Sequence, residues 1–367
     1  MRDQIGMAVL GCGYWGINHV RVLSELPQAR IQVVCDTRPE RLDEVGRRFP
    51  TIRLTTQLEE ALNTPDVDAV VISTPATTHY ALALRCLNAG KHVLVEKPIS
   101  KTVLEAEDLT RRAEARGLVL MVGHTFLYNP AVRTIKDYIQ RGEVGRVYFV
   151  YARRTNMGPI RHDVNALWDL APHDISIFNY LLGGKPEWVS AVGAKVLRNG
   201  REDVGFISLG YPSNVVGHIQ VSWADAYKVR EVVVVGSDRR IVFNDFHPVE
   251  RVRVFEKGVA PVEEATSFDE YQLRIRDGDI VSPAIETSEP LKNQCLHFVE
   301  CVRDGKRPLT DGWAGRDVVQ VMEAIDRSVE RRGAPLEVAH EIQPAQEKPY
   351  VAPRGKVIDK RINTVMP

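Results

Sequence analysis

Apolar residues in the first third of the chain fall into short runs separated by longer amphipathic stretches. The runs are IGMAVLG, ARIQVVCD, DAVVISTP, HVLVEKP and LVLMVGH, and ten or more residues of helical character lie between them. Short apolar runs that alternate with helical stretches are typical of parallel strands joined by helices. We therefore expect residues 1–125 to form an α/β domain with a parallel sheet.

The pattern changes after a helix expected at 129–141. Strand-like segments then follow one another, separated by Gly, Asp, Asn or Pro rather than by helices: GRVYFVYARRT, EWVSAVGAKV, VGFISLGY, VVGHIQVSW, EVVVVGS, RRIVFND and RVRVFEK. These segments predict a second α/β domain, residues 126–340, built on a large, mostly antiparallel open sheet.

Two helical patterns end this second domain, EPLKNQCLHFVECVRDG and GRDVVQVMEAIDRSVERRG. The later one has an apolar face, so it can pack back on the first domain. Residues 341–367 are rich in Pro and charge and have no sustained period. They form either a loose tail or an arm across a neighbouring subunit.

Composition narrows the class of protein. The 367 residues suffice for about two domains, and 44% apolar with 26% charged residues indicates a folded chain. Lys plus Arg equals Asp plus Glu at 48 each, so no overall field attracts nucleic acid or an anionic membrane. Because the chain has no leader pattern, no membrane-length apolar stretch and no CxxC spacing, we expect a soluble cytoplasmic protein without metal or disulfides.

A glycine motif follows the first apolar run directly. GCGYWG places Gly11, Gly13 and Gly16 between the strand MAVL and the helical pattern INHVRVLSEL. In a dinucleotide-binding turn the first Gly permits the tight turn, the second lets backbone approach pyrophosphate, and the third lets helix pack on strand. We expect this turn, with Tyr14 and Trp15, to bind the cofactor phosphates at the helix N-terminus.

An acidic residue follows at the distance that this fold requires. Asp36 lies 20 residues after Gly16, at the end of the second apolar run, where its carboxylate can accept hydrogen bonds from the adenosine ribose. The same charge would repel a ribose phosphate, so NAD is favoured over NADP. Arg38 could pair with a phosphate, stack on adenine, or lie in solvent.

Several motifs occur in an order that identifies a family. With GCGYWG, Asp36, STPATTHY, GKHVLVEKP, WDLAPHD and TDG, the chain resembles the glucose-fructose oxidoreductase and inositol dehydrogenase family, Gfo/Idh/MocA, over residues 7 to about 335. The resemblance implies a Rossmann domain and a second domain whose open sheet often joins subunits, hence a homodimer or homotetramer, with hydride transfer between the domains. It places these residues near the cofactor: Thr74, Pro75, His79, Glu96 and Lys97.

The EKP motif supplies the first candidate catalyst. The resemblance puts Lys97 near the reacting oxygen, in a turn at the end of a Rossmann strand. On residue chemistry alone, Lys97 beside Glu96 could equally be a surface charge pair. Open α/β sheets bind ligands at the carboxyl ends of their strands, however, which favours the functional interpretation.

The segment WDLAPHDISIFNYLLGG supplies the second. Asp169 and His173 are four residues apart, hence on one helical face, and Pro172 is expected in the first helical turn. His173 has a suitable ordinary pKa for a general base toward an alcohol. Asp169 could bond the imidazole or a substrate hydroxyl, or cap the helix. The family commonly has an acid where this chain has Ser176.

The loop before that helix is the candidate substrate-binding segment. In ARRTNMGPIRHDVNALWD we expect contacts with a polar ligand, and this version of the loop looks most like the branch acting on nucleotide-linked sugars. Its residues could instead form only a charged rim. A free inositol or sugar dehydrogenase and a non-catalytic NAD-binding regulator remain as alternatives. The candidate substrate residues are Arg154, Asn156, Arg161, Asn165 and Trp168.

Overall fold

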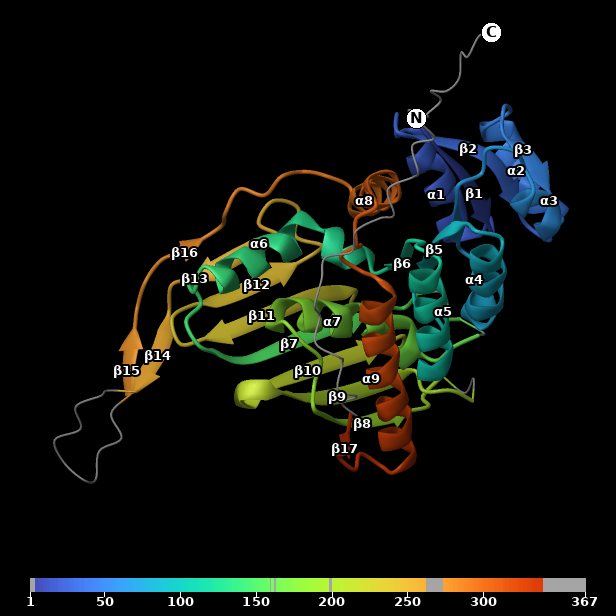
Figure 1. Cartoon of the computed structure of the whole chain (residues 1–367). Helices are drawn as coiled ribbons and strands as arrows, with labels where there is room; N and C mark the ends of the chain where they lie inside the picture. The colour runs from blue at the N-terminus through green and yellow to red at the C-terminus, as the bar shows by residue number, and fades with distance from the viewer. Residues whose placement is uncertain (1–3, 159, 162, 198–199, 262–272, 339–367) are drawn as a thin grey trace, which may run out of the picture.

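The chain forms two sheets that lie side by side, joined by helices at their boundary (Figure 1). The computed structural model describes residues 4–158, 160–161, 163–197, 200–261 and 273–338. The expected tail at 341–367 lies outside this range.

The first sheet has six parallel strands in the order β3-β2-β1-β4-β5-β6, which is the order of the dinucleotide-binding Rossmann fold. The predicted parallel α/β domain is therefore confirmed. The strand β3 was not foreseen, because three residues are too few to show a pattern. The strands are β1 (Ile5–Leu10), β2 (Ala29–Cys35), β3 (Arg53–Thr55), β4 (Ala69–Ile72), β5 (His92–Glu96) and β6 (Leu120–Gly123).

Helices connect these strands across both faces of the sheet, so β1, β4 and β5 are almost entirely buried, as their continuous apolar runs predict. The connecting helices are α1 (Tyr14–Ser24), α2 (Pro39–Arg48), α3 (Leu58–Leu62), η1 (Ala76–Thr78), α4 (His79–Asn88) and α5 (Val103–Ala115).

The second sheet has nine strands in the order β16-β13-β12-β11-β7-β10-β9-β8-β17. Only β7 and β10 are paired in parallel, so the expectation of a mostly antiparallel sheet is confirmed. A separate hairpin joins β14 to β15. The strands are β7 (Val147–Thr155), β8 (Trp188–Ala194), β9 (Val204–Tyr211), β10 (Val215–Ser222), β11 (Val229–Gly236), β12 (Arg240–Asn244), β13 (Val252–Phe255), β14 (Gly258–Pro261), β15 (Leu273–Arg276), β16 (Ile280–Val281) and β17 (Leu336–Glu337).

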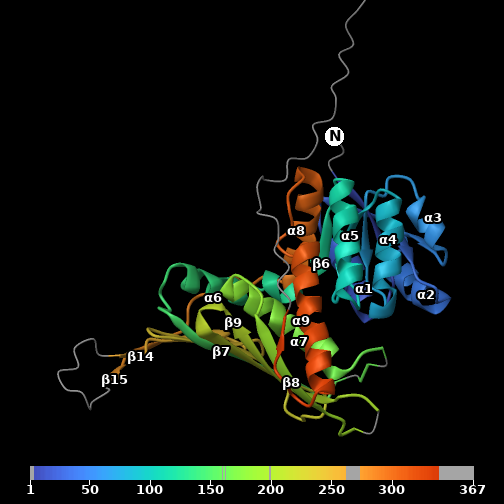
Figure 2. The ribbon, with the colours of Figure 1, turned by 60° about the horizontal axis from the view of Figure 1, so that its bottom comes forward.

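Helices cover one face of this sheet and join it to the first (Figure 2). α9 contacts α5 of the first sheet as well as α7 and β8, and α8 contacts α1 and η2. The opposite sheet face carries no helix in either view. The helices are η2 (Thr125–Tyr128), α6 (Pro130–Gln140), α7 (Ala166–Leu182), η3 (Pro212–Asn214), α8 (Pro290–Asp304) and α9 (Gly312–Glu330).

This arrangement sets the place of a ligand. The parallel strands β1, β2, β4 and β5 all end at one edge of the first sheet, and that edge faces the second domain. Ligands of open α/β sheets bind at such an edge. Within the described residues, none of the helices combines the length and the apolar composition needed to cross a bilayer.

Candidate active site

The glycine turn has the geometry that its motif predicts. Gly11 has φ +88°, and a Cβ there would lie 2.6 Å from the carbonyl oxygen of Ser73. A Cβ on Gly16 would lie 1.9 Å from the carbonyl oxygen of Gly11, so helix α1 can approach the strand only without one. Gly13 faces open space, with nothing within 4 Å of an added Cβ. It is also the N-cap of α1 without a side-chain cap, so the first amides of the helix remain available to an anion.

Asp36 is held rigidly at the end of β2. Its carboxylate accepts hydrogen bonds from the Cys12 amide at 2.7 Å and from the Arg38 amide at 2.9 Å, and the Arg38 Nε lies 3.3 Å away. Burial favours a higher pKa for Asp36, but these hydrogen bonds and the guanidinium outweigh it and lower the pKa. Asp36 is therefore a fixed anion beside the glycine turn.

The other predicted cofactor residues surround the same space. Tyr14 and Trp15 are 78% and 48% exposed and pack edge to face at the start of α1. Thr74 and Pro75 follow β4, directly across from Gly11. Their exposure shows that the described chain leaves these side chains free to meet a ligand.

His79 is buried and connects the backbone at Thr74 with the backbone at Pro98. Its Nε2 lies 2.9 Å from the Thr74 carbonyl oxygen and its Nδ1 lies 2.6 Å from the Pro98 carbonyl oxygen. Burial lowers the pKa of His79 although both carbonyls oppose the shift. The ring lines the cleft, but both of its nitrogens are engaged by backbone carbonyls, one of them at Pro98, next to Lys97.

Glu96 takes part in a buried chain that the motif does not reveal. Its Oε1 lies 2.8 Å from Nε2 of His19, and the other ring nitrogen of His19 lies 3.5 Å from Sγ of Cys295 in α8. Burial opposes protonation of His19, yet Cys295 and Glu96 raise its pKa to about 10. The sequence did not reveal this contact, because Cys295 lies 276 positions after His19 and belongs to no motif.

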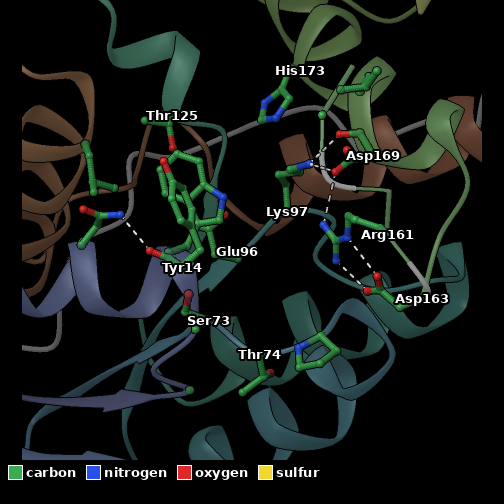
Figure 3. A pocket seen from close by; sticks show the side chains of 18 of the residues that line it. Tyr14, Ser73, Thr74, Glu96, Lys97, Thr125, Arg161, Asp163, Asp169 and His173 are labelled. Atoms are coloured by element: carbon green, nitrogen blue, oxygen red, sulfur yellow. Dashed lines mark hydrogen bonds and ion pairs between the residues drawn. The ribbon is translucent and has the colours of Figure 1, made fainter. Parts of the chain in front are cut away.

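Lys97 and Asp169 meet across the domain boundary. Lys97 Nζ donates to the Asp169 carbonyl oxygen at 2.6 Å and lies 3.4 Å from Oδ1 of the same residue (Figure 3). Lys97 is 8% exposed, so the alternative of a surface charge pair is wrong. Burial is the main cause that lowers the pKa of Lys97, and Arg161 adds to it while Asp169 opposes it.

The helix that carries Asp169 and His173 begins earlier than expected. α7 starts at Ala166, and Asn165 caps it by accepting a hydrogen bond from the Trp168 amide at 3.0 Å. Pro172 therefore lies in the second turn, which corrects its predicted place in the first. Because Asn165 fills the cap, Asp169 is no cap either. It also makes no hydrogen bond to the imidazole: its carboxylate binds Lys97, Arg161 and the indole of Trp223.

His173 lines the cleft one helical turn beyond Asp169. Its ring packs edge to face against Phe126 with 5.2 Å between centroids. Nδ1 is buried and has no hydrogen-bond partner among the residues that the structure describes. Burial, reinforced by Lys97 and Arg154, lowers the pKa of His173 well below its ordinary value. The imidazole is therefore neutral at neutral pH.

Three of the five expected substrate residues line the cleft: Arg154, Asn156 and Arg161. Arg154 lines the cleft, but Asp174 holds its guanidinium by two bonds of 2.7 and 2.9 Å. Arg161 likewise lines the cleft while bound to Asp163 by two bonds and to Asp169 by one. Asn156 is the one polar side chain of the set with a free group, since its Oδ1 has no described partner.

Asn165 and Trp168 do not line the cleft. Asn165 is engaged as the cap of α7 and also donates to Glu202 at 2.9 Å, while the buried Trp168 donates its indole N–H to Asp326 at 2.8 Å. Their role is to fix α7 in place.

The glycine turn, Asp36, Lys97, Asp169 and His173 border one cleft of about 1690 Å³. Typical small-molecule pockets have about 300–1,000 Å³, so this one has room for a dinucleotide and a second ligand. Figure 3 shows Tyr14 and Ser73 on one side and Lys97, Asp169 and His173 on the other. The lining residues that sequence reasoning did not assign include Thr125, Phe126, Asn129, Asp245 and Arg251, which belong to no short motif.

Comparisons with known proteins agree with this fold. The family described as "Oxidoreductase family, NAD-binding Rossmann fold" matches residues 5–124, and the "GFO/IDH/MocA C-terminal domain" matches residues 132–242. The chain is 27% identical to scyllo-inositol 2-dehydrogenase (NAD(+)) of Bacillus subtilis, over 84% of this chain and 89% of that one. It is 26% identical to UDP-N-acetylglucosamine 3-dehydrogenase of Acidithiobacillus ferrooxidans, over 88% and 98%.

A solved structure extends the likeness to three dimensions. GenD2 from gentamicin A biosynthesis, in complex with NAD, has a TM-score of 0.77 and 27% identity, covering 92% of this chain and 97% of that chain. The fold and the cleft define a dinucleotide-dependent dehydrogenase acting on CH–OH groups. The chain belongs to the Gfo/Idh/MocA oxidoreductase family and binds NAD(P) in its Rossmann domain.

Proposed function

We propose that this protein transfers a hydride between NAD and a carbinol carbon of a sugar, with His173 as the general base and Lys97 as the group that stabilises the reacting oxygen. The observation that carries the proposal is the convergence of Lys97, directly after β5, and His173, from α7, on the cleft that the glycine turn also borders. NAD bound along this turn supplies the hydride acceptor in one direction and the donor in the other.

His173 suits proton transfer because it is neutral and unpartnered. A neutral imidazole can accept the hydroxyl proton as the carbinol is oxidised, and it returns that proton in the reverse reaction. Its Nδ1 has no partner among the described residues, although a buried polar atom without a bond costs about 1–3 kcal/mol. A substrate hydroxyl or a water molecule would satisfy the ring.

Lys97 suits charge stabilisation because it is fixed and only partly neutralised. The Asp169 carbonyl takes one of its N–H groups, and the Asp169 carboxylate is shared with Arg161. An ammonium group has three donors, so Lys97 retains a donor for the oxygen that gains charge as its proton leaves. Asp169 is thus a positioning residue in this proposal.

NAD rather than NADP follows from the place of Asp36. The carboxylate is held at the adenosine end by two backbone amides, and its lowered pKa keeps it charged at neutral pH. Like charges about 4 Å apart repel by about 1 kcal/mol in water and more when partly buried. A ribose 2′-phosphate therefore meets an obstacle that a 2′-hydroxyl does not.

A nucleotide-linked sugar is the substrate that we propose. The cleft of about 1690 Å³ is larger than typical small-molecule pockets of about 300–1,000 Å³, and one similar protein is named for UDP-N-acetylglucosamine. A free inositol is the competing substrate, because the relative of Bacillus subtilis is named for scyllo-inositol.

Nicotinamide absorbance decides between these substrates. NAD reduction would be followed with UDP-N-acetylglucosamine, a UDP-uronate, scyllo-inositol and glucose, with His173→Ala as the control. Turnover confined to nucleotide sugars supports the proposal, and turnover of inositol alone replaces its substrate. NAD binding without turnover in either direction would favour the regulator and overturn the catalytic proposal.

The bare face of the second sheet supports a homodimer or homotetramer. Large apolar side chains on β7, β8, β9 and β10 are exposed there: Phe149, Val192, Phe206 and Val216, each between 41% and 46%. Monomeric proteins seldom leave such an apolar patch uncovered. Sedimentation should show an oligomer that Phe206→Glu dissociates, whereas a monomeric wild type would contradict this assembly.

A further inference from the structure

One wall of the cleft alternates cationic groups with aromatic rings. It starts at His173, whose ring contacts Phe126. The Arg230 guanidinium carbon lies 5.7 Å from the centre of Phe126 and 5.1 Å from that of Phe246, and Lys228 Nζ lies 4.9 Å from Phe246. We call these five residues the cation–ring row. It extends from the catalytic histidine toward the far end of the cleft.

Strand pairing and a closed loop hold this row in place. Arg230 in β11 is paired directly with Arg154 in β7, and the guanidinium of Arg154 lies 4.3 Å from the centre of Phe126. The loop between β12 and β13 is closed by a bond from the Asn244 amide to the Arg251 carbonyl at 2.8 Å. Arg251 lines the same cleft as Lys228 and Arg230.

The charges at this end are not balanced, in contrast to those beside Lys97. Arg154 and Arg161 each have a two-bond carboxylate partner. Arg230 has a single contact with a carboxylate, from its Nη1 to Asp245 Oδ2 at 3.2 Å. For Lys228 and Arg251, the described part of the chain provides no carboxylate contact. Three cations thus face one carboxylate.

Aromatic rings hold a cation without cancelling its charge. The ring of Phe126 lies between Arg154 and Arg230, two like charges on neighbouring strands whose mutual repulsion would fall if an anion lay beside them. A concave wall with an excess of one charge also concentrates ligands of the opposite charge. The wall is therefore suited to an anionic ligand.

We propose that Lys228, Arg230 and Arg251 form an anion subsite, which holds a phosphate or carboxylate group of the substrate while its carbinol lies at His173. The proposal rests on the dehydrogenase function above and deepens it, because it restricts the substrate to sugars that carry an anionic group away from the reacting carbon. Arg230 is the fixed member of the subsite, and Lys228 and Arg251 are exposed members at its edge.

Calorimetric titration of the NAD-loaded protein tests the subsite apart from turnover. The probes are UDP for a diphosphate, glucuronate for a carboxylate, and inorganic phosphate. Lys228→Ala combined with Arg251→Ala should weaken the binding of UDP or of glucuronate at least tenfold, because charge-assisted hydrogen bonds contribute about 1.5–3 kcal/mol. Lys257→Ala is the matched control, since Lys257 is an exposed lysine paired with Asp277 outside the cleft.

The outcomes separate the subsite from the dehydrogenase function. A loss with UDP identifies a diphosphate substrate, and a loss with glucuronate identifies a uronate; each supports the subsite. A double variant that binds both probes as the wild type does would overturn it, as would a wild type that binds neither. Turnover of neutral glucose by a wild type that binds neither probe would leave the dehydrogenase standing without the subsite, whereas anion binding without any turnover would do the reverse.

Discussion

The two halves of the cleft are built in different ways. The cofactor half depends on one turn of six residues, 11–16, and on Asp36 at the end of the adjacent strand. The substrate half takes Lys97 from the turn after β5, Phe126 from η2, His173 from α7 and Arg230 from β11, four segments that are separate in the chain. The cofactor half is therefore determined by the local backbone of one short segment, whereas the substrate half depends on how distant segments pack together in the fold.

This difference explains how each half selects its ligand. Backbone amides and a missing Cβ recognise a pyrophosphate whatever the rest of the chain does. Side chains such as Arg154 and Arg161 can bind a carboxylate of the protein or one of a ligand, and the fold decides which. In this protein both arginines are already bound to carboxylates, which is why we propose other cations, Lys228, Arg230 and Arg251, for the substrate.

The largest expected effect separates chemistry from cofactor binding. His173→Ala should lower kcat by about 10²–10⁴-fold, because no other group would take the hydroxyl proton. Affinity for NAD should stay at the wild-type value, since His173 belongs to the substrate half. Steady-state kinetics and NAD titration measure the two effects.

His173→Asn is the matched variant for size and polarity. It keeps a polar side chain in the same place but cannot accept the proton, so it should lose as much activity as His173→Ala. Near-normal turnover by His173→Asn would show that the ring only fills space. The substrate half of the cleft would then have no assigned general base.

The same division accounts for what the sequence predicts. The parallel α/β character of the first domain, the turn at Gly11, Gly13 and Gly16, and the place of Asp36 at a strand end all follow from contiguous residues and known turn geometry. Lys97 could also be placed, because its strand ends at the ligand-binding edge. Local patterns carry enough information for features that local backbone geometry determines.

Pairing between distant residues could not be predicted in this way. The expected substrate contacts of Asn165 and Trp168 are wrong because Asn165 caps α7 and Trp168 reaches Asp326 in α9. No spacing rule shows that Arg154 meets Asp174, which lies 20 positions later. The cation–ring row is hidden for the same reason, since its members come from four separate segments.

The second effect tests the cofactor half. Gly13→Ala should weaken NAD binding by about 10- to 100-fold, as expected from losing a charge-assisted contact of about 1.5–3 kcal/mol between backbone and pyrophosphate. Thermal stability should not change, because an added Cβ meets nothing within 4 Å in the free protein. Gly184→Ala is the control, since an added Cβ there is equally unhindered but lies outside the cleft. Unchanged NAD affinity in Gly13→Ala would disprove the close approach.

The third effect concerns stability and acid. His124, after β6, is buried, and neither ring nitrogen has a partner in the described structure. Burial, with help from Lys97, lowers its pKa to about 4, against about 6.5 when unfolded. The unfolded chain therefore binds more protons than the folded protein between these two pH values. As a result, the free energy of unfolding decreases as the pH is lowered from about 6.5 to 4. Its share is about 2 kcal/mol between pH 6.5 and 5.

Urea unfolding at the two pH values measures this contribution. His124→Asn removes the titrating ring, so the free energy of unfolding should fall less steeply toward pH 5 than in the wild type. His19 should act in the opposite sense: its pKa is raised to about 10, so the stability it contributes is complete below about 6.5 and is lost as pH rises toward 10. Parallel pH profiles for wild type and His124→Asn would refute the assignment.

The smallest expected effect is the change in cofactor preference. Asp36→Asn removes the charge beside the ribose, so repulsion of a 2′-phosphate should fall by about 1 kcal/mol or more, and the NAD to NADP preference should drop about tenfold. Asp43→Asn, an exposed acid on α2 outside the cleft, controls for the general loss of negative charge. The Cys12 and Arg38 amides bind different oxygens of Asp36, so the single amide oxygen of Asn keeps an acceptor for one of them. An unchanged preference would mean that side chains such as Arg38, and not the strand-end acid, select the dinucleotide, and the cofactor half would then depend on assembly as the substrate half does.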